Sequence, residues 1–176
     1  MDLLLAQDGD DTAFGRMVTS CDADIRRFCA WSGVPANDAD DVVQETFLRA
    51  FRGLGSFRGD STARSWLLTI ARRVFLDFAD RKAKDMKVVS HLVTSSLTVS
   101  NSVSADEAEL VGLHDLVSRL PGEFREAFVL VRIFGFKYDE VSSIVGCPRG
   151  TVQSRVARAR ECLADLSDLV DHRQIS

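Results

Sequence analysis

The sequence predicts an all-α protein made of two small helical domains joined by an extended linker. Apolar residues recur at spacings of three and four over most of the chain, which is typical of amphipathic helices. Glycine and proline residues interrupt this periodicity at short intervals, and one internal segment, residues 85–106, lacks it altogether. We therefore divide the chain into a domain at 1–84, a linker at 85–106 and a domain at 107–176.

The composition is that of a globular cytoplasmic protein. The 176 residues are 45% hydrophobic and 27% charged, and no apolar run is long enough for a membrane span. The acidic start of the chain has an apolar run too short for a signal peptide. The four cysteines form no CxxC pair and no cluster with histidine, so we expect reduced thiols, without a disulfide framework or a metal site. They are Cys21, Cys29, Cys147 and Cys162.

Two helices are expected before residue 55. The first spans Asp11–Cys29 and ends at Ser32–Pro35. Its inward face comprises Phe14, Met17, Val18, Cys21, Ile25, Phe28 and Cys29. The second follows, with Asn37 or Asp38 as its cap. Its buried stripe comprises Val43, Phe47, Ala50 or Phe51, and Leu54.

A second set of residues lies on another side of that helix. It consists of Asp41, Gln44, Glu45, Leu48 and Arg49. A leucine surrounded by carboxylates on an outer face suits a contact with another protein. An isolated exposed leucine is also ordinary, so the residues alone leave both interpretations open.

A glycine-rich loop, residues 53–61, leads into a basic helix. A loop with three glycines and one aromatic could close around an extruded base, or simply connect two helices. Asp60 or Ser61 is the expected cap of the next helix. Trp66 suits its core better than a base platform. The cationic positions of this helix, suited to phosphate, are Arg64, Arg72, Arg73, Arg81, Lys82 and Lys84.

The linker is rich in Ser, Thr and Val. It keeps several apolar residues, so we expect an extended segment that lies in a groove of a partner. The alternation of these residue types also allows an edge strand.

The last domain ends in a helix-turn-helix. Two helices, either side of Pro121-Gly122, precede a short helix that starts at Tyr138 and ends before Gly146. Pro148 suits the first turn of the following helix. Val152, Val156, Ala159 and Leu163 form the buried stripe of that helix, and its arginines fall off the stripe. Such a helix lies in a DNA major groove.

The distribution of charge favours two nucleic-acid contacts in spite of the net charge of −4. Residues 1–48 carry ten acidic and three basic side chains, whereas residues 49–87 carry ten basic and four acidic ones. Residues 148–160 contain four arginines and no acid. Two basic regions separated by acidic ones indicate two contacts with nucleic acid and a further partner. Solvated charged faces are the simpler alternative.

These motifs resemble those of the extracytoplasmic-function bacterial sigma factors, the small subunits that direct RNA polymerase to promoters. The segment DDVVQETFLRAFRGLGSFRGDSTARSWLLTIARR is similar to sigma domain 2. The segment LPGEFREAFVLVRIFGFKYDEVSSIVGCPRGTVQSRVARAR is similar to sigma domain 4. The linker matches the family in position and length. The resemblance covers the whole chain.

The resemblance implies three groups of functional residues. The contact with the clamp helices of the polymerase largest subunit would use Asp41, Gln44, Glu45, Leu48 and Arg49. The −10 element would be held by Phe57, Arg58, Gly59, Asp60, Ser61, Arg64, Trp66, Arg72 and Arg73. The −35 element would be read by Arg149, Thr151, Gln153, Ser154, Arg155 and Arg158. Gln153 departs from the usual lysine, Arg73 from the usual asparagine, and Lys137 from the usual capping serine or threonine.

The partners implied are core RNA polymerase, including its flap, and promoter DNA, both duplex and melted. An anti-sigma factor is a further candidate partner, and the free chain would be a monomer. Mutual masking, with acids of residues 1–48 facing the arginines of the last domain, is the alternative to an anti-sigma factor. The chain has no catalytic motif and requires no cofactor. The alternative function is a stand-alone helix-turn-helix transcriptional regulator.

Overall fold

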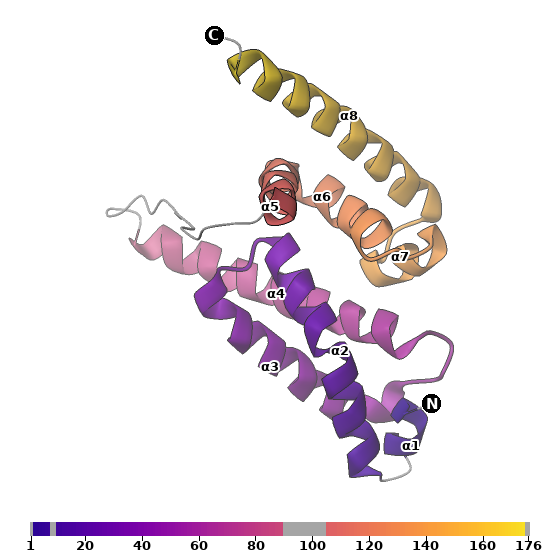
Figure 1. Ribbon diagram of the computed structural model, residues 1–176. Coiled ribbons are helices and arrows are strands. Elements are labelled where there is room, and N and C mark those ends of the chain that lie inside the picture. The colour runs from indigo at the N-terminus through magenta and orange to yellow at the C-terminus, as the bar shows by residue number, and fades with distance from the viewer. Residues whose placement is uncertain (1, 8–9, 90–104, 175–176) are drawn as a thin grey trace.

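The computed structural model describes residues 2–7, 10–89 and 105–174, and within these ranges every regular element is helical. The predicted all-α class is confirmed (Figure 1). The first group of elements, called here the N-terminal unit, comprises α1 (Asp2–Gln7), α2 (Asp11–Ser32), α3 (Ala36–Arg52), the 3₁₀ turn η1 (Leu54–Ser56) and α4 (Ala63–Val89). The second group, the C-terminal unit, comprises α5 (Ala105–Ser118), α6 (Gly122–Phe128), the π-helical turn η2 (Val129–Ile133), α7 (Tyr138–Val145) and α8 (Arg149–Gln174).

The expected linker is shorter at both ends than the sequence indicates. Helix α4 continues through Val89, and α5 already begins at Ala105. The remaining part, 90–104, lies outside the described residues, and so do the predictions of an extended segment or an edge strand there.

The capping residues in the structure show which helix ends were predicted correctly and which were not. Asp10 caps α2 by accepting hydrogen bonds from the N–H groups of Thr12 and Ala13, and Gly33 ends the helix with φ of 86°. The cap expected at Asn37 or Asp38 is wrong. Helix α3 already begins at Ala36, after Pro35, whose fixed φ prepares the first turn.

The cap expected at Asp60 or Ser61 is also wrong. The hydroxyl of Thr62 accepts the Ser65 N–H at 3.1 Å, so Thr62 caps α4. At α7, the side chain of Lys137 makes no capping bond. The Glu140 carboxylate instead accepts the Lys137 backbone N–H at 2.9 Å, which completes half of a capping box.

The helix-turn-helix has the expected geometry. Gly146 takes the left-handed conformation that ends α7, with φ of 75°, and the hydroxyl of Ser142 donates to the Cys147 carbonyl to close the turn. Val152, Val156 and Ala159 are buried, and Leu163, the last residue of the predicted stripe, is half-buried against the core.

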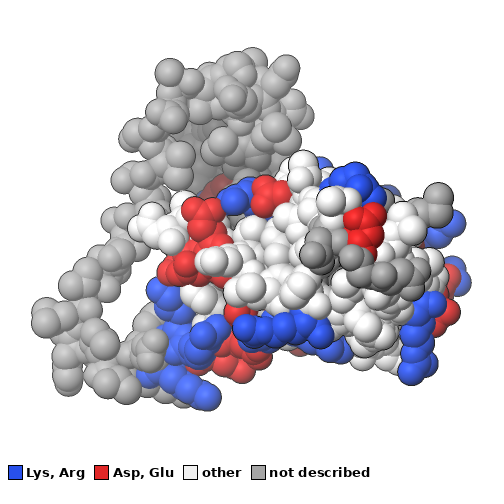
Figure 2. All heavy atoms as spheres, turned by 90° about the horizontal axis from the view of Figure 1, so that it is seen from below, with Lys and Arg blue, Asp and Glu red and all other residues white. Residues whose placement is uncertain are grey.

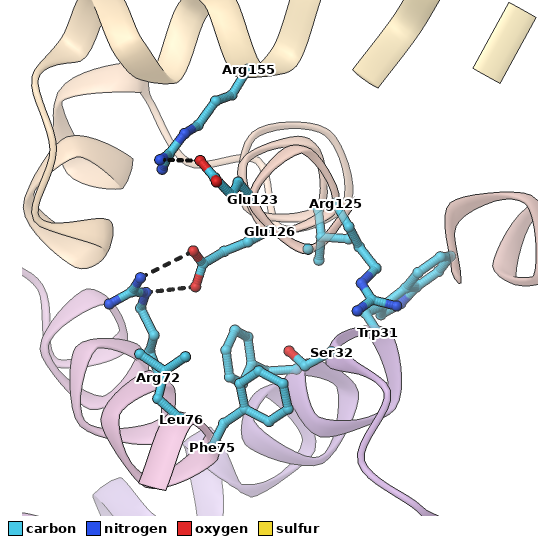
Figure 3. Close-up of a pocket in the computed structure, with 12 residues that line it drawn as sticks. Trp31, Ser32, Arg72, Phe75, Leu76, Glu123, Arg125, Glu126 and Arg155 are labelled. Atoms are coloured by element: carbon cyan, nitrogen blue, oxygen red, sulfur yellow. Dashed lines mark hydrogen bonds and ion pairs between the residues drawn. The ribbon is translucent and has the colours of Figure 1, made fainter. Parts of the chain in front are cut away.

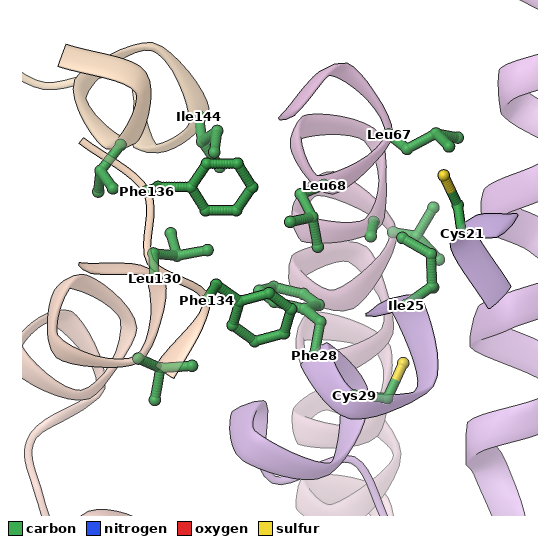
Figure 4. Packing of buried hydrophobic residues seen from close by; sticks show 14 of the residues in the cluster. Cys21, Ile25, Phe28, Cys29, Leu67, Leu68, Leu130, Phe134, Phe136 and Ile144 are labelled. Atoms are coloured by element: carbon green, nitrogen blue, oxygen red, sulfur yellow. The ribbon is translucent and has the colours of Figure 1, made fainter. Parts of the chain in front are cut away.

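The two units pack against each other through one continuous apolar core. Phe28 of α2 and Leu68 of α4 lie opposite Leu130 and Phe134 of the C-terminal unit (Figure 4). Helix α4 also contacts α7, and α2 contacts α5 and α6. The sequence indicated two domains held by a tether, and mutual masking of the domains was the alternative drawn from the distribution of charge. The domains do close on each other, but through residues other than those of that hypothesis.

Candidate nucleic-acid interface

Most of the residues predicted to read duplex DNA lie on the free side of α8. Arg149, Gln153, Ser154 and Arg158 are exposed, and Thr151 is half-buried. Arg149 pairs with Asp139 at 3.3 Å and Arg158 with Glu161 at 3.9 Å. Ion pairs this exposed contribute at most about 1 kcal/mol, so phosphates or base edges can replace their carboxylates at little cost.

Arg155 does not share this face. Its side chain is 21% exposed, its Nη2 donates to the Glu123 carboxylate of α6, and its Nη1 lies 3.7 Å from the Cys147 sulfur. The guanidinium therefore supports the packing of α8 on α6 in this arrangement, unlike the neighbouring arginines.

The loop predicted to hold melted DNA has one buried anchor and an exposed tip. Phe57 is 9% exposed and packs edge-on against the Trp66 ring, with centroids 5.4 Å apart. The tip, Arg58, Gly59, Asp60 and Ser61, is exposed, and Gly59 has a φ of 76°, which favours glycine. Trp66, which is half-buried, is thus a packing residue for the loop, as the sequence favoured.

Two basic residues of α4 are engaged by the C-terminal unit. Arg72 forms two hydrogen bonds with the Glu126 carboxylate, at 2.6 and 3.3 Å (Figure 3). Arg64 is held by Asp24 at 2.6 and 3.2 Å, donates to the Phe134 carbonyl at 3.1 Å, and stacks on the Phe136 ring. Arg73, one position along the helix, is exposed.

The π-helical turn η2 provides acceptors for this contact. Its wider spacing pairs the Phe134 N–H with the Val129 carbonyl, five residues back. The helix ends at this point, which leaves the carbonyls of Ile133 and Phe134 available to other donors. Arg27 of α2 donates to the Ile133 carbonyl and lies 4.7 Å above the Phe134 ring. Sequence reasoning missed Arg27, because a pair of adjacent arginines, Arg26 and Arg27, in an acidic segment carries no signal for a partner far along the chain.

The hypothesis that acidic residues of 1–48 face the arginines of the last domain is wrong. Among the ion pairs of the described ranges, the acidic residues of 1–48 pair with basic residues of their own unit. The arginine hydrogen bonds between the units instead run from α2 and α4 to acceptors of the C-terminal unit.

A cavity of about 440 Å³ opens between the units beside the Arg72–Glu126 pair (Figure 3). Phe28, Phe75 and Val129 contribute apolar walls, and Arg125 and Arg155 lie at its rim. A second cleft, of about 570 Å³, separates the loop tip from Asp139 and Glu140 of α7. Asp139 and Glu140 line this cleft, and their negative charge would disfavour a phosphate backbone there in the closed arrangement.

The residues predicted to contact polymerase form one outer strip of α3. Asp41, Gln44 and Leu48 are exposed, with Leu48 at 43%. Arg49 bridges Glu45 at 2.7 Å and Asp77 at 2.6 Å. These partners, Glu45 first, raise the pKa of Arg49 by favouring its charged form.

The surface of the N-terminal unit is mixed in charge. Figure 2, seen from below Figure 1, shows lysine and arginine side chains around a broad uncharged area, with acidic side chains between them. The described part of the chain holds no group of three or more His, Cys, Asp or Glu side chains placed to bind a metal ion. Among the helices of the described residues, none is both long and apolar enough to cross a membrane.

Two family models match the chain. Residues 17–85 match sigma-70 region 2, and residues 110–163 match sigma-70 region 4. These segments contain the loop and α4 in the first case and the helix-turn-helix in the second.

Named relatives and solved structures agree with these matches. The chain is 33% identical over 160 residues to the ECF RNA polymerase sigma factor SigC of Mycobacterium tuberculosis, covering 91% of this chain and 86% of the relative. It is 33% identical over 168 residues to the ECF RNA polymerase sigma-E factor of Escherichia coli, covering 89% and 87%. The sigma factor RpoE, in complex with the anti-sigma factor NepR from Bartonella quintana, superposes with a TM-score of 0.78 at 26% identity, covering 88% of this chain and 96% of that one. CnrH, in complex with the cytosolic domain of CnrY, superposes with a TM-score of 0.73 at 27% identity, covering 96% of both chains.

Proposed function

The chain belongs to the extracytoplasmic-function sigma factors, which direct transcription initiation, and from this premise we propose how its residues divide the work. Residues 1–84 bind core RNA polymerase and the −10 element, and residues 107–176 bind the −35 element. The segment 85–106 joins the two in the polymerase. The chain acts in the cytoplasm by binding alone, and we assign it no reaction and no cofactor.

The observation that carries the proposal is the exposed polar face of α8. Arg149, Gln153 and Arg158 are exposed on the second helix of a helix-turn-helix whose opposite stripe is buried. In the major groove, arginine pairs with guanine edges in a bidentate manner and also reaches phosphates, while glutamine pairs with adenine. Gln153, where the family usually has lysine, therefore exchanges a charged phosphate contact for a polar one that can read a base.

The loop after η1 provides the second DNA-binding site. Its exposed tip, residues 58–61, would receive a base of the −10 element once the duplex opens. Removing a base from the stack costs a few kcal/mol, which a pocket and backbone contacts must offset. The cation of Arg58 and the exposed Arg73 would hold the phosphates on either side.

The outer strip of α3 is the proposed contact with the polymerase clamp helices. Leu48 supplies the apolar anchor, and Asp41 and Gln44 form its polar rim. An anchor of this kind in a polar rim is the usual anatomy of a protein interface.

The closed arrangement requires a rearrangement before DNA can bind. Arg64 and Arg72 are engaged with the C-terminal unit, so their use on the −10 element requires the two units to separate. We assign this separation to core polymerase, which would hold the units at promoter spacing. The free chain is accordingly a closed monomer.

An anti-sigma factor is the second partner that we propose. Two structures similar to this chain contain such a factor or a partner's cytosolic domain. The apolar cavity between the units, lined by Phe28, Phe75 and Val129, offers a surface that a partner could use to keep the units together.

Duplex DNA binding distinguishes this function from a stand-alone helix-turn-helix regulator. A sigma factor that needs polymerase to open it should bind promoter duplex weakly alone and specifically with core enzyme. The measurement is a duplex titration with and without core polymerase, on fragments chosen from a map of polymerase occupancy. Tight, sequence-specific binding by the isolated chain, with no gain from core enzyme, would favour the regulator instead.

A further inference from the structure

Helix α1 lies against the loop that the proposed function assigns to the −10 element. The periodicity of the sequence indicated no element before Asp11. The short helix is nevertheless anchored, since Leu3 is 1% and Ala6 is 8% exposed, and it contacts both α2 and η1. Its last residue, Gln7, is half-buried against the loop.

The Gln7 side chain holds both ends of the turn that precedes the loop tip. Its Nε2 donates to the Leu54 carbonyl at 2.6 Å and to the Phe57 carbonyl at 2.7 Å. A primary amide nitrogen has two hydrogens, so both are used, and two carbonyl acceptors determine which way the amide is turned. The Leu54 carbonyl also accepts the Phe57 N–H at 3.1 Å, which closes the same turn from within.

The loop tip needs such support because its own backbone offers little. Gly53, Gly55 and Gly59 make the segment conformationally permissive, and the tip from Arg58 to Ser61 has no regular structure. Fixing each residue of such a loop at the moment of binding costs conformational entropy, which weakens the complex. A turn held in place before DNA arrives removes part of that cost.

A second contact of α1 lies at the tip itself. A Cβ built on Gly59 would lie 4.0 Å from the Leu4 Cδ2 atom, so α1 also lies close to the left-handed residue of the tip. The Phe57 side chain packs against the Trp66 ring. The Phe57 carbonyl, which Gln7 binds, is the last backbone group before the tip.

We infer that Gln7 is a positioning residue for recognition of the melted −10 strand: it fixes the backbone of Leu54–Phe57 so that the tip meets the extruded base in the right place. Gln7 acts through the loop and does not contact DNA. This inference rests on the proposed role of the loop and extends it to α1.

The test uses holoenzyme, reconstituted from the full chain and core polymerase, and a pool of randomised single-stranded DNA. Bound DNA is recovered and sequenced, so the preferred motif emerges from the pool itself, whatever the promoter sequence is. Gln7→Leu keeps the size of the side chain and removes both donors, and Gln7→Glu keeps its shape with the same loss. Thr19→Val is the matched control, since that hydroxyl donates to the Gly15 carbonyl on an exposed part of α2.

The expected result for both Gln7 variants is a roughly tenfold loss of motif enrichment from the loss of two hydrogen bonds. Affinity for core polymerase and retention of −35 duplex should stay as in the wild type and in Thr19→Val. Unchanged enrichment in both variants would overturn the inference, and so would an equal loss of core affinity, which indicates a general structural role. A wild-type holoenzyme that enriches no motif would instead refute the proposed role of the loop itself.

Discussion

The Arg72–Glu126 pair is the contact whose removal most directly tests the closed arrangement. Glu126→Gln keeps the shape of the side chain and removes the charge that holds Arg72 across the interface. Both side chains are largely buried, at 21% and 17% exposure, and they share two hydrogen bonds of 2.6 and 3.3 Å. Loss of such a pair costs about 1.5 to 3 kcal/mol, because the remaining guanidinium stays partly desolvated with a weaker acceptor.

A cost of that size shifts the balance between closed and open forms about tenfold to a hundredfold toward open. Binding of core polymerase draws on the open form only, so its apparent affinity should rise with the open fraction, up to the point where the chain is mostly open. Glu126 belongs to none of the proposed DNA or polymerase contacts. A gain in affinity for core polymerase would therefore come from opening of the chain and not from a changed contact surface.

Two measurements report the result: the radius of gyration of the free chain by solution scattering, and a titration of core polymerase. Asp115→Asn is the control, because it removes a carboxylate of the same unit whose partner, Arg119, is exposed. We expect Glu126→Gln to be more extended and to bind polymerase more tightly, and the control to behave as the wild type. A compact variant with unchanged polymerase affinity would refute the reasoning.

Three further predictions test individual residues. Arg158→Ala should weaken −35 duplex binding by holoenzyme about tenfold, with little effect on stability. Arg155→Ala should instead lower the thermal midpoint, because it removes the partner of Glu123. If the two variants changed duplex affinity and thermal midpoint equally, the separate roles of the two arginines would be contradicted. Leu48→Ala should weaken core binding about tenfold and leave the circular dichroism spectrum unchanged, and wild-type affinity would exclude α3 as the clamp contact. Burial raises the pKa of the Cys29 thiol from 9.0 to about 11, so the folded state keeps a proton that the unfolded state loses. Stability should therefore be intact below pH 9 and fall as pH rises toward 11, by at most about 2 kcal/mol, and a Cys29→Ala variant with the same slope in urea titrations would show that the thiol is not its source.

The helix-turn-helix was predictable from the sequence in most of its detail because its signals are local. Gly146 requires a positive φ, and Val152, Val156 and Ala159 recur at helical spacing, so the turn and the buried stripe follow from this segment alone. The strip of α3 around Leu48 follows from the same periodicity.

The parts that sequence reasoning missed depend on residues far apart in the chain. The sequence position of Arg155 on α8 suggests a DNA-reading residue, but in this structure its guanidinium forms an ion pair with Glu123 of α6. Arg64 binds the Phe134 carbonyl at the end of a π-helical turn, and Arg72 binds the Glu126 carboxylate of α6. The pattern of apolar residues does not distinguish a π turn from an α-helix, and it does not show which distant carboxylate an arginine will meet. Gln7 was missed because a short helix has too few residues to show a period.

Run-off transcription with core polymerase tests the central claim most directly. The template is a library of genomic fragments, and the 5′ ends of the transcripts are sequenced after addition of this chain. If the chain is a sigma factor that binds both promoter elements, the start sites should share two motifs, at −10 and −35. Substitution of both arginines, Arg58→Ala with Arg158→Ala, should abolish transcription from these start sites. Start sites with no shared motif, or the same start sites from core polymerase alone, would contradict the claim.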